Sequence, residues 1–364
     1  MTTRTESSLP AQLERMARAH DARRTRQLLK DERVTLSHGA GGKASHQLLE
    51  GLIFPALASG ALLGQDDAAV LAVDGVRLAF TTDSYVVSPI FFPGGDIGSL
   101  AVHGTVNDLA MQGARPLALS VALVLEEGFE TAELRRVLES MAAAARASGV
   151  EIVTGDTKVV PRGKADRIFI TTSGVGVVGA DVHLSMRNAR AGDRVLVSGA
   201  IGDHGMAVML AREALELESE IRSDSAPLSE LVSVLLAAAP GTRALKDPTR
   251  GGVATALIEI AEQAGVGIAI DEERVPVHDA VRGACEILGL DPMHIANEGK
   301  LIAIVPPDEA GAALAAMRAH SLGTEAAIVG EVTNEHDGMV IVRTGVGGSR
   351  VLDMLVGDPL PRIC

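Results

Sequence analysis

The chain alternates short runs rich in Val, Ile, Leu and Thr with longer stretches of helical pattern, and this alternation constrains its fold more than any other feature. Apolar runs punctuated by Gly or Asp predict strands at 69–73, 77–82, 117–125, 167–173 and 194–198. Helix start and stop signals predict helices at 97–111 and 131–148. After a turn-rich segment the pattern predicts helices at 204–215, 228–239, 252–264, 279–288 and 308–320, and strands at 301–305, 327–332 and 339–342. The sequence therefore predicts an α/β assembly.

The length and the turn-rich segment at 186–193 together predict two domains. A chain of 364 residues, 47% of them apolar, has enough material for a core in each. We expect an N-terminal extension at 1–32, a first domain at 33–186, a second domain at 187–346 and a Gly- and Pro-containing tail at 347–364.

Composition argues against nucleic acid and membrane partners. The net charge of -14 repels a phosphate backbone, and the chain has no Trp and one Tyr on which bases could stack. The longest apolar stretches, such as 231–239, fall short of the roughly 20 residues that span a bilayer. The first thirty residues resemble neither a secretory signal nor a transit peptide. With only two cysteines, we expect a cytoplasmic protein without a disulfide framework.

Short acidic motifs flanked by Gly or Thr recur along the chain, at 65–70, 81–84, 107–109, 155–157 and 246–252. Carboxylates placed at strand ends, in loops and on helices can converge on one or two Mg²⁺ ions, which prefer oxygen ligands. Any single motif is equally well interpreted as a turn or a helix cap. The five motifs together favour metal binding.

Two glycine-rich segments invite a nucleotide interpretation. His38-Gly39-Ala40-Gly41-Gly42-Lys43 lacks the Walker spacing, but its free amides beside a lysine suit phosphate oxygens; the alternative is a flexible loop. The segment 174–179 matches the dinucleotide spacing G-x-G-x-x-G, yet its valines continue a strand pattern and no helix opens after it. We therefore exclude a dinucleotide site there.

Each cysteine has a different interpretation. Cys364, the last residue, follows a Pro- and Gly-containing segment, so its thiol can swing into a cleft and act as a nucleophile or carrier. On residue type alone, an incidental cysteine in a disordered tail is the better explanation. Cys285 lies in a predicted helix and is interpreted as a small core residue.

Taken together, six motifs resemble the HypE family of hydrogenase maturation proteins, over essentially everything after residue 32. The motifs are His38–Lys43, Thr81–Val87, Phe91–Gly98, Val153–Val160, Asn297–Lys300 and the terminal Pro361-Arg362-Ile363-Cys364. The family is related to the aminoimidazole ribonucleotide synthetase and selenophosphate synthetase superfamily of homodimeric ATP enzymes. The resemblance implies a two-domain, PurM-like α+β fold with an N-terminal domain whose sheet forms the dimer interface, a C-terminal α/β domain and a flexible C-terminal tail.

The resemblance also implies an activity and partners. A carbamoyltransferase similar to HypF would load a carbamoyl group onto Cys364, and this chain would use ATP and Mg²⁺ to convert the S-carboxamide to an S-cyanide. The cyanide would pass to iron held by a complex similar to HypC–HypD, for the active site of a nickel-iron hydrogenase. Phosphorylation of the amide oxygen would make it a leaving group, which demands cations for the phosphoryl group and a base near the nitrogen.

Carried over motif by motif, the resemblance implies a role for each matching residue. It assigns Asp67, Asp83, Asp108 and Asp247 to Mg²⁺, with Asp66 and Asp156 as further ligands or supporting groups. Lys158 and Glu298 would handle the thiocarboxamide; the alternative is a buried ion pair between the domains. His38, Gly41, Gly42 and Lys43 would lie over the phosphates, and Arg250, Gly251 and Gly252 would line the same cleft. His103 and His204 are interpreted as structural residues.

Two other functions fit parts of this pattern. A synthetase of the same superfamily would act on a diffusible substrate and would have no need of Cys364. A nucleotide-bound scaffold would use the acidic motifs for stability only. Neither explains a terminal thiol alongside an acidic ATP-type site.

Overall fold

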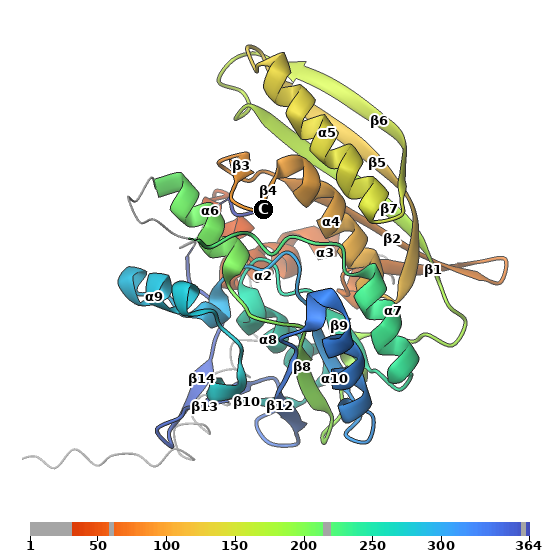
Figure 1. Cartoon of the computed structure of the whole chain (residues 1–364), viewed down its shortest axis with the longest axis vertical. Coiled ribbons are helices and arrows are strands. Elements are labelled where there is room, and N and C mark those ends of the chain that lie inside the picture. The colour runs from red at the N-terminus through yellow and green to blue at the C-terminus, as the bar shows by residue number, and fades with distance from the viewer. Residues whose placement is uncertain (1–30, 58–61, 214–219, 358–361) are drawn as a thin grey trace, which may run out of the picture.

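The structure is a computed structural model that describes residues 31–57, 62–213, 220–357 and 362–364. Residues 1–30 of the predicted extension therefore lie outside the described part, as do the last two positions of the helix predicted at 204–215 and residues 358–361 of the predicted tail. The described chain forms two halves, each built on its own sheet (Figure 1).

The first sheet has five strands in the order β1-β2-β7-β5-β6. Their bounds are β1 (Ala69–Val73), β2 (Val76–Tyr85), β5 (Ala114–Glu126), β6 (Glu151–Val160) and β7 (Ile168–Val178). Helices α4 (Ile97–Met111) and α5 (Thr131–Ala147) cover one face (Figure 1). Large apolar side chains remain exposed on β2 and β5, among them Phe80 at 48% and Leu117 at 38%. This half therefore buries one face of its sheet and presents apolar surface elsewhere.

The second sheet has seven strands in the order β14-β13-β10-β12-β8-β11-β9. The strands are β8 (Arg194–Val197), β9 (Ala244–Lys246), β10 (Gly267–Asp271), β11 (Ile302–Val305), β12 (Ala327–Thr333), β13 (Val340–Arg343) and β14 (Ser349–Leu352). The helices are α6 (Asp203–Glu213), α7 (Ser229–Ala238), α8 (Gly252–Ala264), α9 (Asp279–Leu288) and α10 (Ala310–Ala319).

Both faces of this second sheet are packed around its central strands. Val195 and Val197 of β8 join a core with α8, whereas Leu196 between them joins a core with α7 and α10. Successive strand residues point to opposite faces, so an uninterrupted apolar run fits a strand that is covered on both sides. The two sheets and their helices agree with the predicted two-domain α+β fold.

Short elements connect these layers. Before β1 lie η1 (Leu36–Gly39), α2 (Lys43–Leu48), η2 (Leu49–Ile53), α3 (Phe54–Leu57) and η3 (Leu62–Gly64). A two-stranded ribbon, β3 (Phe91–Phe92) and β4 (Gly95–Asp96), precedes α4. The remaining 3₁₀ turns are η4 (Met186–Asn188), η5 (Glu272–Arg274), η6 (Pro292–His294) and η7 (Ser321–Gly323). In the part of the chain that the structure describes, no helix is both long and apolar enough to cross a bilayer.

Asn107, on α4, ties the two halves together. Its Nδ2 group donates to the carbonyl oxygens of Ala226 at 3.0 Å and Glu298 at 3.2 Å. Its Oδ1 atom accepts from the amide of Leu228 at 2.8 Å. This side chain is 1% exposed, so it satisfies three buried main-chain groups of the second half from a helix of the first.

The last residues of the chain are packed against both halves. Part of the predicted tail, Ser349–Leu352, is β14, which pairs antiparallel with β13. Ile363 is 2% exposed and belongs to the core of the first half. Figure 1 shows the C-terminus between the two halves.

Candidate active site

A group of buried carboxyl side chains gathers where α4, β2 and the end of β9 meet. Asp108 of α4 accepts a hydrogen bond from the Thr81 hydroxyl of β2 at 2.8 Å. Burial raises the pKa of Asp108 well above its usual range, and the nearby charges of Asp247, Asp67 and Asp83 raise it further. Four of the predicted metal ligands are therefore close enough to repel one another.

Lys246 partly neutralises this group. Its Nζ atom lies 2.5 Å from Asp67 Oδ1 and 3.2 Å from Glu259 Oε2 of α8. Burial alone would lower the pKa of Lys246, but the two carboxylates outweigh burial and raise it well above its usual value. Burial, followed by the charge of Asp67, raises the pKa of Asp247 to about 8. Asp67 and Asp83 also have raised pKa values, again chiefly because of burial. The group therefore still favours an additional cation.

Cys364 reaches this same group within its own chain. Burial raises the pKa of its thiol to about 12, Arg250 opposes that rise, and the charges of Glu298, Asp83 and Asp247 add to it. Cys364 is in turn the largest influence that raises the pKa of Arg250. The terminal thiol thus lies within electrostatic reach of a guanidinium group and of several carboxyl groups.

Glu298 is a buried carboxyl group within electrostatic reach of that thiol. Its side chain is buried, and its Oε1 atom has no hydrogen-bond partner among the described residues. Burial, followed by the charge of Asp247, raises the pKa of Glu298 well above its usual value, while Arg250 lowers it. A buried polar atom without a partner indicates a position that a substrate group fills.

The glycine-rich loop packs against the start of α8. The Gly39 carbonyl oxygen accepts from Arg250 Nη1 at 2.9 Å, and the Gly41 carbonyl oxygen accepts from Thr255 Oγ1 at 3.2 Å. Gly41 has a φ of +71°, and a Cβ atom at Gly42 would come within 2.5 Å of a backbone carbonyl oxygen. The loop can therefore hold this shape only with glycine at these positions.

The remaining predicted phosphate-cleft residues lie around this contact. Gly251 is the N-cap of α8 and Gly252 its first residue, both with positive φ. His38 is buried and accepts from the Thr35 amide through Nδ1 at 3.0 Å. Lys43 forms an ion pair with Asp353 at 2.5 Å. The predicted phosphate loop and Arg250-Gly251-Gly252 are thus brought together.

Three further predicted site residues have local partners of their own. Asp66 accepts from the Met186 amide at 2.9 Å and the Ser185 hydroxyl at 3.0 Å, so it binds the start of η4. Asp156 and Lys158 lie on the exposed edge strand β6, where they form an ion pair at 2.6 Å. The hydrogen bonds to Lys158 and Thr157 lower the pKa of Asp156.

The strand register of the first sheet explains why Lys158 lies apart from the cluster of buried Asp side chains. Asp83 pairs with Thr172, Thr172 with Val121, and Val121 with Gly155 of β6. Paired residues share a face, so Asp156 and Lys158, at one and three positions after Gly155, lie on the opposite face from Asp83. Within one chain these two residues are also three strands away from Asp83.

The fit of Mg²⁺ can be judged from the donor set. Among the described residues, no three His, Cys, Asp or Glu side chains are arranged to hold a metal ion by themselves. The raised pKa values of Asp67, Asp83, Asp108 and Asp247 show that the group lacks positive charge. Mg²⁺ binds oxygen atoms and commonly completes its shell with water and substrate phosphate. The residues present therefore fit an ion that binds together with a nucleotide.

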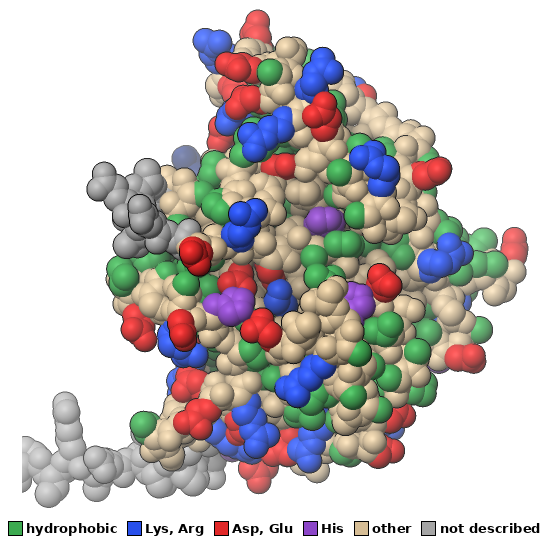
Figure 2. Space-filling model, viewed as in Figure 1, with side chains coloured by type: hydrophobic (Ala, Val, Ile, Leu, Met, Phe, Trp, Pro, Cys, Tyr) green, Lys and Arg blue, Asp and Glu red, His purple; other side chains and the backbone are tan. Residues whose placement is uncertain are grey.

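Sequence reasoning assigned no role to Lys246, Glu259 or Asn107. Lys246 immediately precedes Asp247, which is the signal that was available for it. Glu259 and Asn107 act through contacts between distant segments, which no sequence spacing reveals. Figure 2 shows acidic, basic and His side chains gathered where the two halves meet.

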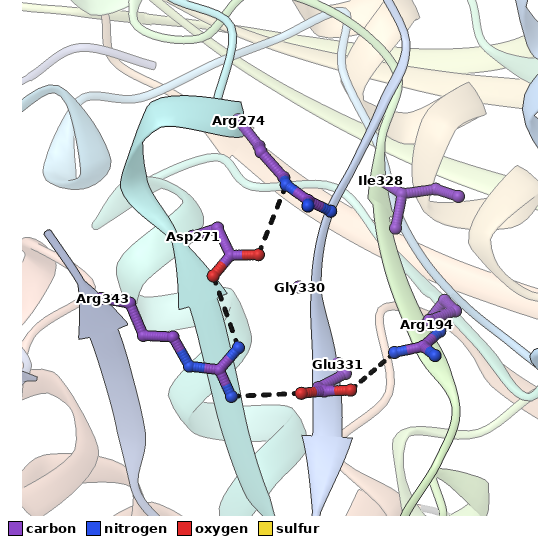
Figure 3. Close-up of a pocket in the computed structure, with 7 residues that line it drawn as sticks. All are labelled: Arg194, Asp271, Arg274, Ile328, Gly330, Glu331 and Arg343. Atoms are coloured by element: carbon purple, nitrogen blue, oxygen red, sulfur yellow. Dashed lines mark hydrogen bonds and ion pairs between the residues drawn. The ribbon is translucent and has the colours of Figure 1, made fainter. Parts of the chain in front are cut away.

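A separate cavity of about 430 Å³ lies on the second sheet, away from this site (Figure 3). It is lined by Arg194, Asp271, Arg274, Ile328, Gly330, Glu331 and Arg343. Its charged side chains form one continuous series of ion pairs. Asp271 pairs with Arg274 and Arg343, and Glu331 pairs with Arg343 and Arg194. These pairs account for the charges of the cavity without a ligand.

Comparison with known proteins places this geometry in context. Residues 65–178 match the family described as AIR synthase related protein, N-terminal domain, and residues 190–343 match its C-terminal domain. The chain is 55% identical over 337 residues to the carbamoyl dehydratase HypE of Cupriavidus necator, covering 92% of this chain and 96% of that protein.

Solved structures agree with the sequence comparison. A crystal structure of the hydrogenase maturation protein HypE in complex with ATP is 48% identical, has a TM-score of 0.77, and covers 91% of this chain and 100% of that one. A crystal structure of a HypE–HypF complex is also 48% identical, has a TM-score of 0.81, and covers 85% of this chain and 99% of that one.

Proposed function

The chain belongs to the HypE carbamoyl dehydratase family, and from that premise we propose that it dehydrates a carbamoyl group carried on its own Cys364 thiol, with ATP as co-substrate. The observation that supports this proposal is the position of Cys364, which is held against the first half and lies within electrostatic reach of Arg250, Glu298 and the buried Asp residues. A synthetase that acts on a diffusible substrate has no reason to place its last residue there.

The proposed reaction balances without any other reactant. The amide oxygen of the S-carboxamide attacks the γ-phosphorus of ATP, ADP leaves, and one nitrogen proton is lost. The resulting iminophosphate then loses phosphate as the second nitrogen proton is removed, which leaves an S-cyanide. The oxygen atom of the lost water ends in phosphate. Positioning and charge stabilisation supply most of the catalysis in such phosphoryl transfers.

Glu298 is the proposed acceptor of a nitrogen proton. Its raised pKa makes its ionised form a stronger base than an ordinary carboxylate. Arg250, which lowers that pKa, would also stabilise negative charge that develops on the amide oxygen. A proton acceptor and a cation, both within electrostatic reach of Cys364, would meet both demands of the reaction.

The nucleotide phosphates would bind between the two glycine segments. Gly41 contacts Arg250 and Gly251. The proposed cleft also includes Gly252 and the loop residues His38, Gly42 and Lys43. Asp67, Asp83, Asp108 and Asp247 would hold Mg²⁺, which supplies positive charge to the transferring phosphoryl group when bound. Asp66, which binds η4, would support Asp67 from the adjacent position.

We propose that the functional unit is a homodimer formed through the first sheet. The exposed apolar side chains of Phe80 and Leu117 support such an interface. The predicted roles of Lys158 and Asp156 then require the partner subunit, because their own register directs them away from Asp83. Residues 33–186 would form this dimerisation domain, and residues 187–346 the second domain.

The proposed partners follow from the relatives and from the chemistry. The HypE–HypF complex supports a carbamoyltransferase similar to HypF as the protein that loads Cys364. A complex similar to HypC–HypD would take the cyanide onto iron for a nickel-iron hydrogenase. Such an exchange of reactive groups between maturation proteins would take place in the cytoplasm.

Intact-protein mass spectrometry tests the carrier and the dehydration separately. After treatment with the carbamoyltransferase, the wild type should gain one carbamoyl group, and after addition of Mg²⁺ and ATP it should lose one water. Cys364→Ala should do neither, whereas Cys285→Ala, the matched control, should do both. If no adduct forms, or if Cys364→Ala is modified equally, the thiol carrier is refuted.

A second variant tests the proton acceptor. Glu298→Gln keeps the size of the side chain and removes its basic form, so carbamoylation should proceed and dehydration should slow by about 10² to 10⁴-fold. Dehydration at the wild-type rate would assign the proton transfer to another group.

A further inference from the structure

The main chain of the last three residues is held on one side by the segment that follows β2. The Val86 amide donates to a terminal carboxylate oxygen of Cys364 at 3.1 Å, and the Ser88 amide donates to the Arg362 carbonyl oxygen at 3.2 Å. The Arg362 side chain donates to the Val86 carbonyl oxygen at 2.9 Å and pairs with Asp166. The terminal segment therefore adds to the first half much as a short strand would.

Helix α6 of the second half holds the same segment from the other side. His204 Nε2 lies 3.0 Å from the Ile363 carbonyl oxygen. Arg212 donates through Nη2 to the Arg362 carbonyl oxygen at 2.9 Å and through Nε to the Ser88 carbonyl oxygen at 2.8 Å. Positions 204 and 212 are eight residues apart, so they share a face of the helix. One helix face thus binds two consecutive main-chain carbonyl groups.

The protonation and tautomer of His204 suit it to donate a hydrogen bond from Nε2. The ring is fully buried, and burial lowers its pKa, so it is neutral. A carbonyl oxygen only accepts, so the hydrogen resides on Nε2, and Nδ1 accepts from the Ser223 hydroxyl at 2.8 Å. Phe92 packs against the ring edge-on, with centroids 5.4 Å apart. Both nitrogens and the orientation of the ring are therefore fixed.

We propose that His204 and Arg212 are positioning residues that dock the main chain of residues 362–364 and thereby fix the Cys364 thiol against the core of the first half. Their hydrogen bonds to this segment reach the carbonyl oxygens of Ile363 and Arg362, so they act on the thiol through the segment that carries it. The inference rests on the proposed function in that the docked thiol is the position from which dehydration takes place.

Alkylation of Cys364 by iodoacetamide, measured without ATP or any partner, tests only the docking of residues 362–364 by His204 and Arg212, which we call the dock. A docked thiol reacts only in the fraction of molecules whose tail has opened. Arg212→Met keeps an unbranched apolar stem and removes the donors. His204→Phe keeps an aromatic ring and removes its donor. Each variant should raise the rate of Cys364 alkylation by about fivefold or more, the factor that corresponds to a hydrogen bond of about 1 kcal/mol. Arg212→Lys, which keeps one donor group, should lie between Met and the wild type.

Cys285 is an internal control for misfolding. It is 1% exposed in α9 and shares a core with Met206 and Ala207 of α6. Burial raises its pKa to about 11. If a substitution disturbs α6 itself, Cys285 will react faster too. An unchanged Cys364 rate, or a parallel rise at both cysteines, would overturn the proposal.

Single-turnover dehydration of carbamoylated protein then links the dock to the reaction. Arg212→Met should slow it, with Arg212→Lys intermediate. If alkylation rises and the wild type performs no dehydration, the dock stands and the proposed function fails. If the wild type dehydrates and all variants match it in both assays, the proposed function stands and the dock fails.

Discussion

Glu259 is predicted to contribute a large share of the stability that this protein has at neutral pH. Its carboxylate lies 3.2 Å from Lys246 Nζ and 3.1 Å from His46 Nε2. Burial opposes ionisation, but Lys246 and His46 outweigh it and lower the pKa of Glu259 from 4.5 to about 2. One pKa unit corresponds to about 1.4 kcal/mol, so this interval amounts to about 3 kcal/mol. Because the side chain is 23% exposed, solvent screening makes that figure an upper value.

The sign of the pH dependence follows from the lowered pKa. The contribution is fully present above pH 4.5 and is lost as pH falls through the folded-state value of about 2. Glu259→Gln should therefore lower the free energy of unfolding at pH 7 by about 2–3 kcal/mol, and its acid-unfolding curve should lack this component. Urea denaturation at pH 7, with acid titration followed by circular dichroism, measures both.

Glu262→Gln provides a matched control for this substitution. Glu262 lies on the same helix, α8, but its side chain is exposed, so the change should stay within about 0.5 kcal/mol. Equal stability of Glu259→Gln and the wild type at pH 7 would refute the argument that the ion pairs of Glu259 with Lys246 and His46 stabilise the fold.

Three other predictions follow from single positions. Gly42→Ala, whose Cβ atom would meet a carbonyl oxygen at 2.5 Å, should abolish ATP binding measured by calorimetry, whereas Gly39→Ala, with nothing within 4 Å, should retain it. The hydrogen bond to Asp203 raises the pKa of His278. The contact between His278 and Asp203 therefore stabilises the fold below pH 6.5, and this stabilisation is lost as pH rises through the raised pKa of His278. A His278 pKa at or below 6.5 in an NMR titration would contradict this. Phe80→Glu, on the exposed sheet face, should shift the protein to monomers in sedimentation experiments, and an unchanged dimer would place the interface elsewhere.

Elements with strong local signals were predicted from sequence at their observed bounds. Helices 97–111, 252–264 and 279–288 and strand 69–73 match the structure because caps, glycines and apolar periodicity all lie within them. The strand at 151–160 was not predicted. It is an edge strand exposed on both faces, so it lacks the alternation that identifies a half-buried strand, and it carries Gly155 and Asp156 in its middle.

In the candidate site, too, residues in local motifs were predicted from the sequence, whereas placements that depend on long-range contacts were not. Asp67, Asp83, Asp108 and Asp247 stand in motifs recognisable one by one, and the structure places them within electrostatic reach of one another. The sheet face on which Lys158 lies depends on pairing among four strands, which no local pattern encodes. The role of His204 likewise depends on where a segment far along the chain comes to rest.

The side chain of Asn107 has a consequence for how this molecule can move. It donates to the main-chain carbonyl oxygen of Glu298 from a helix of the opposite half. Any motion that separates the halves along this contact must therefore displace Glu298 in the same event. If the proposed function holds, passage of Cys364 between a loading partner and the site would then require release of residues 362–364 from their hydrogen bonds rather than separation of the halves.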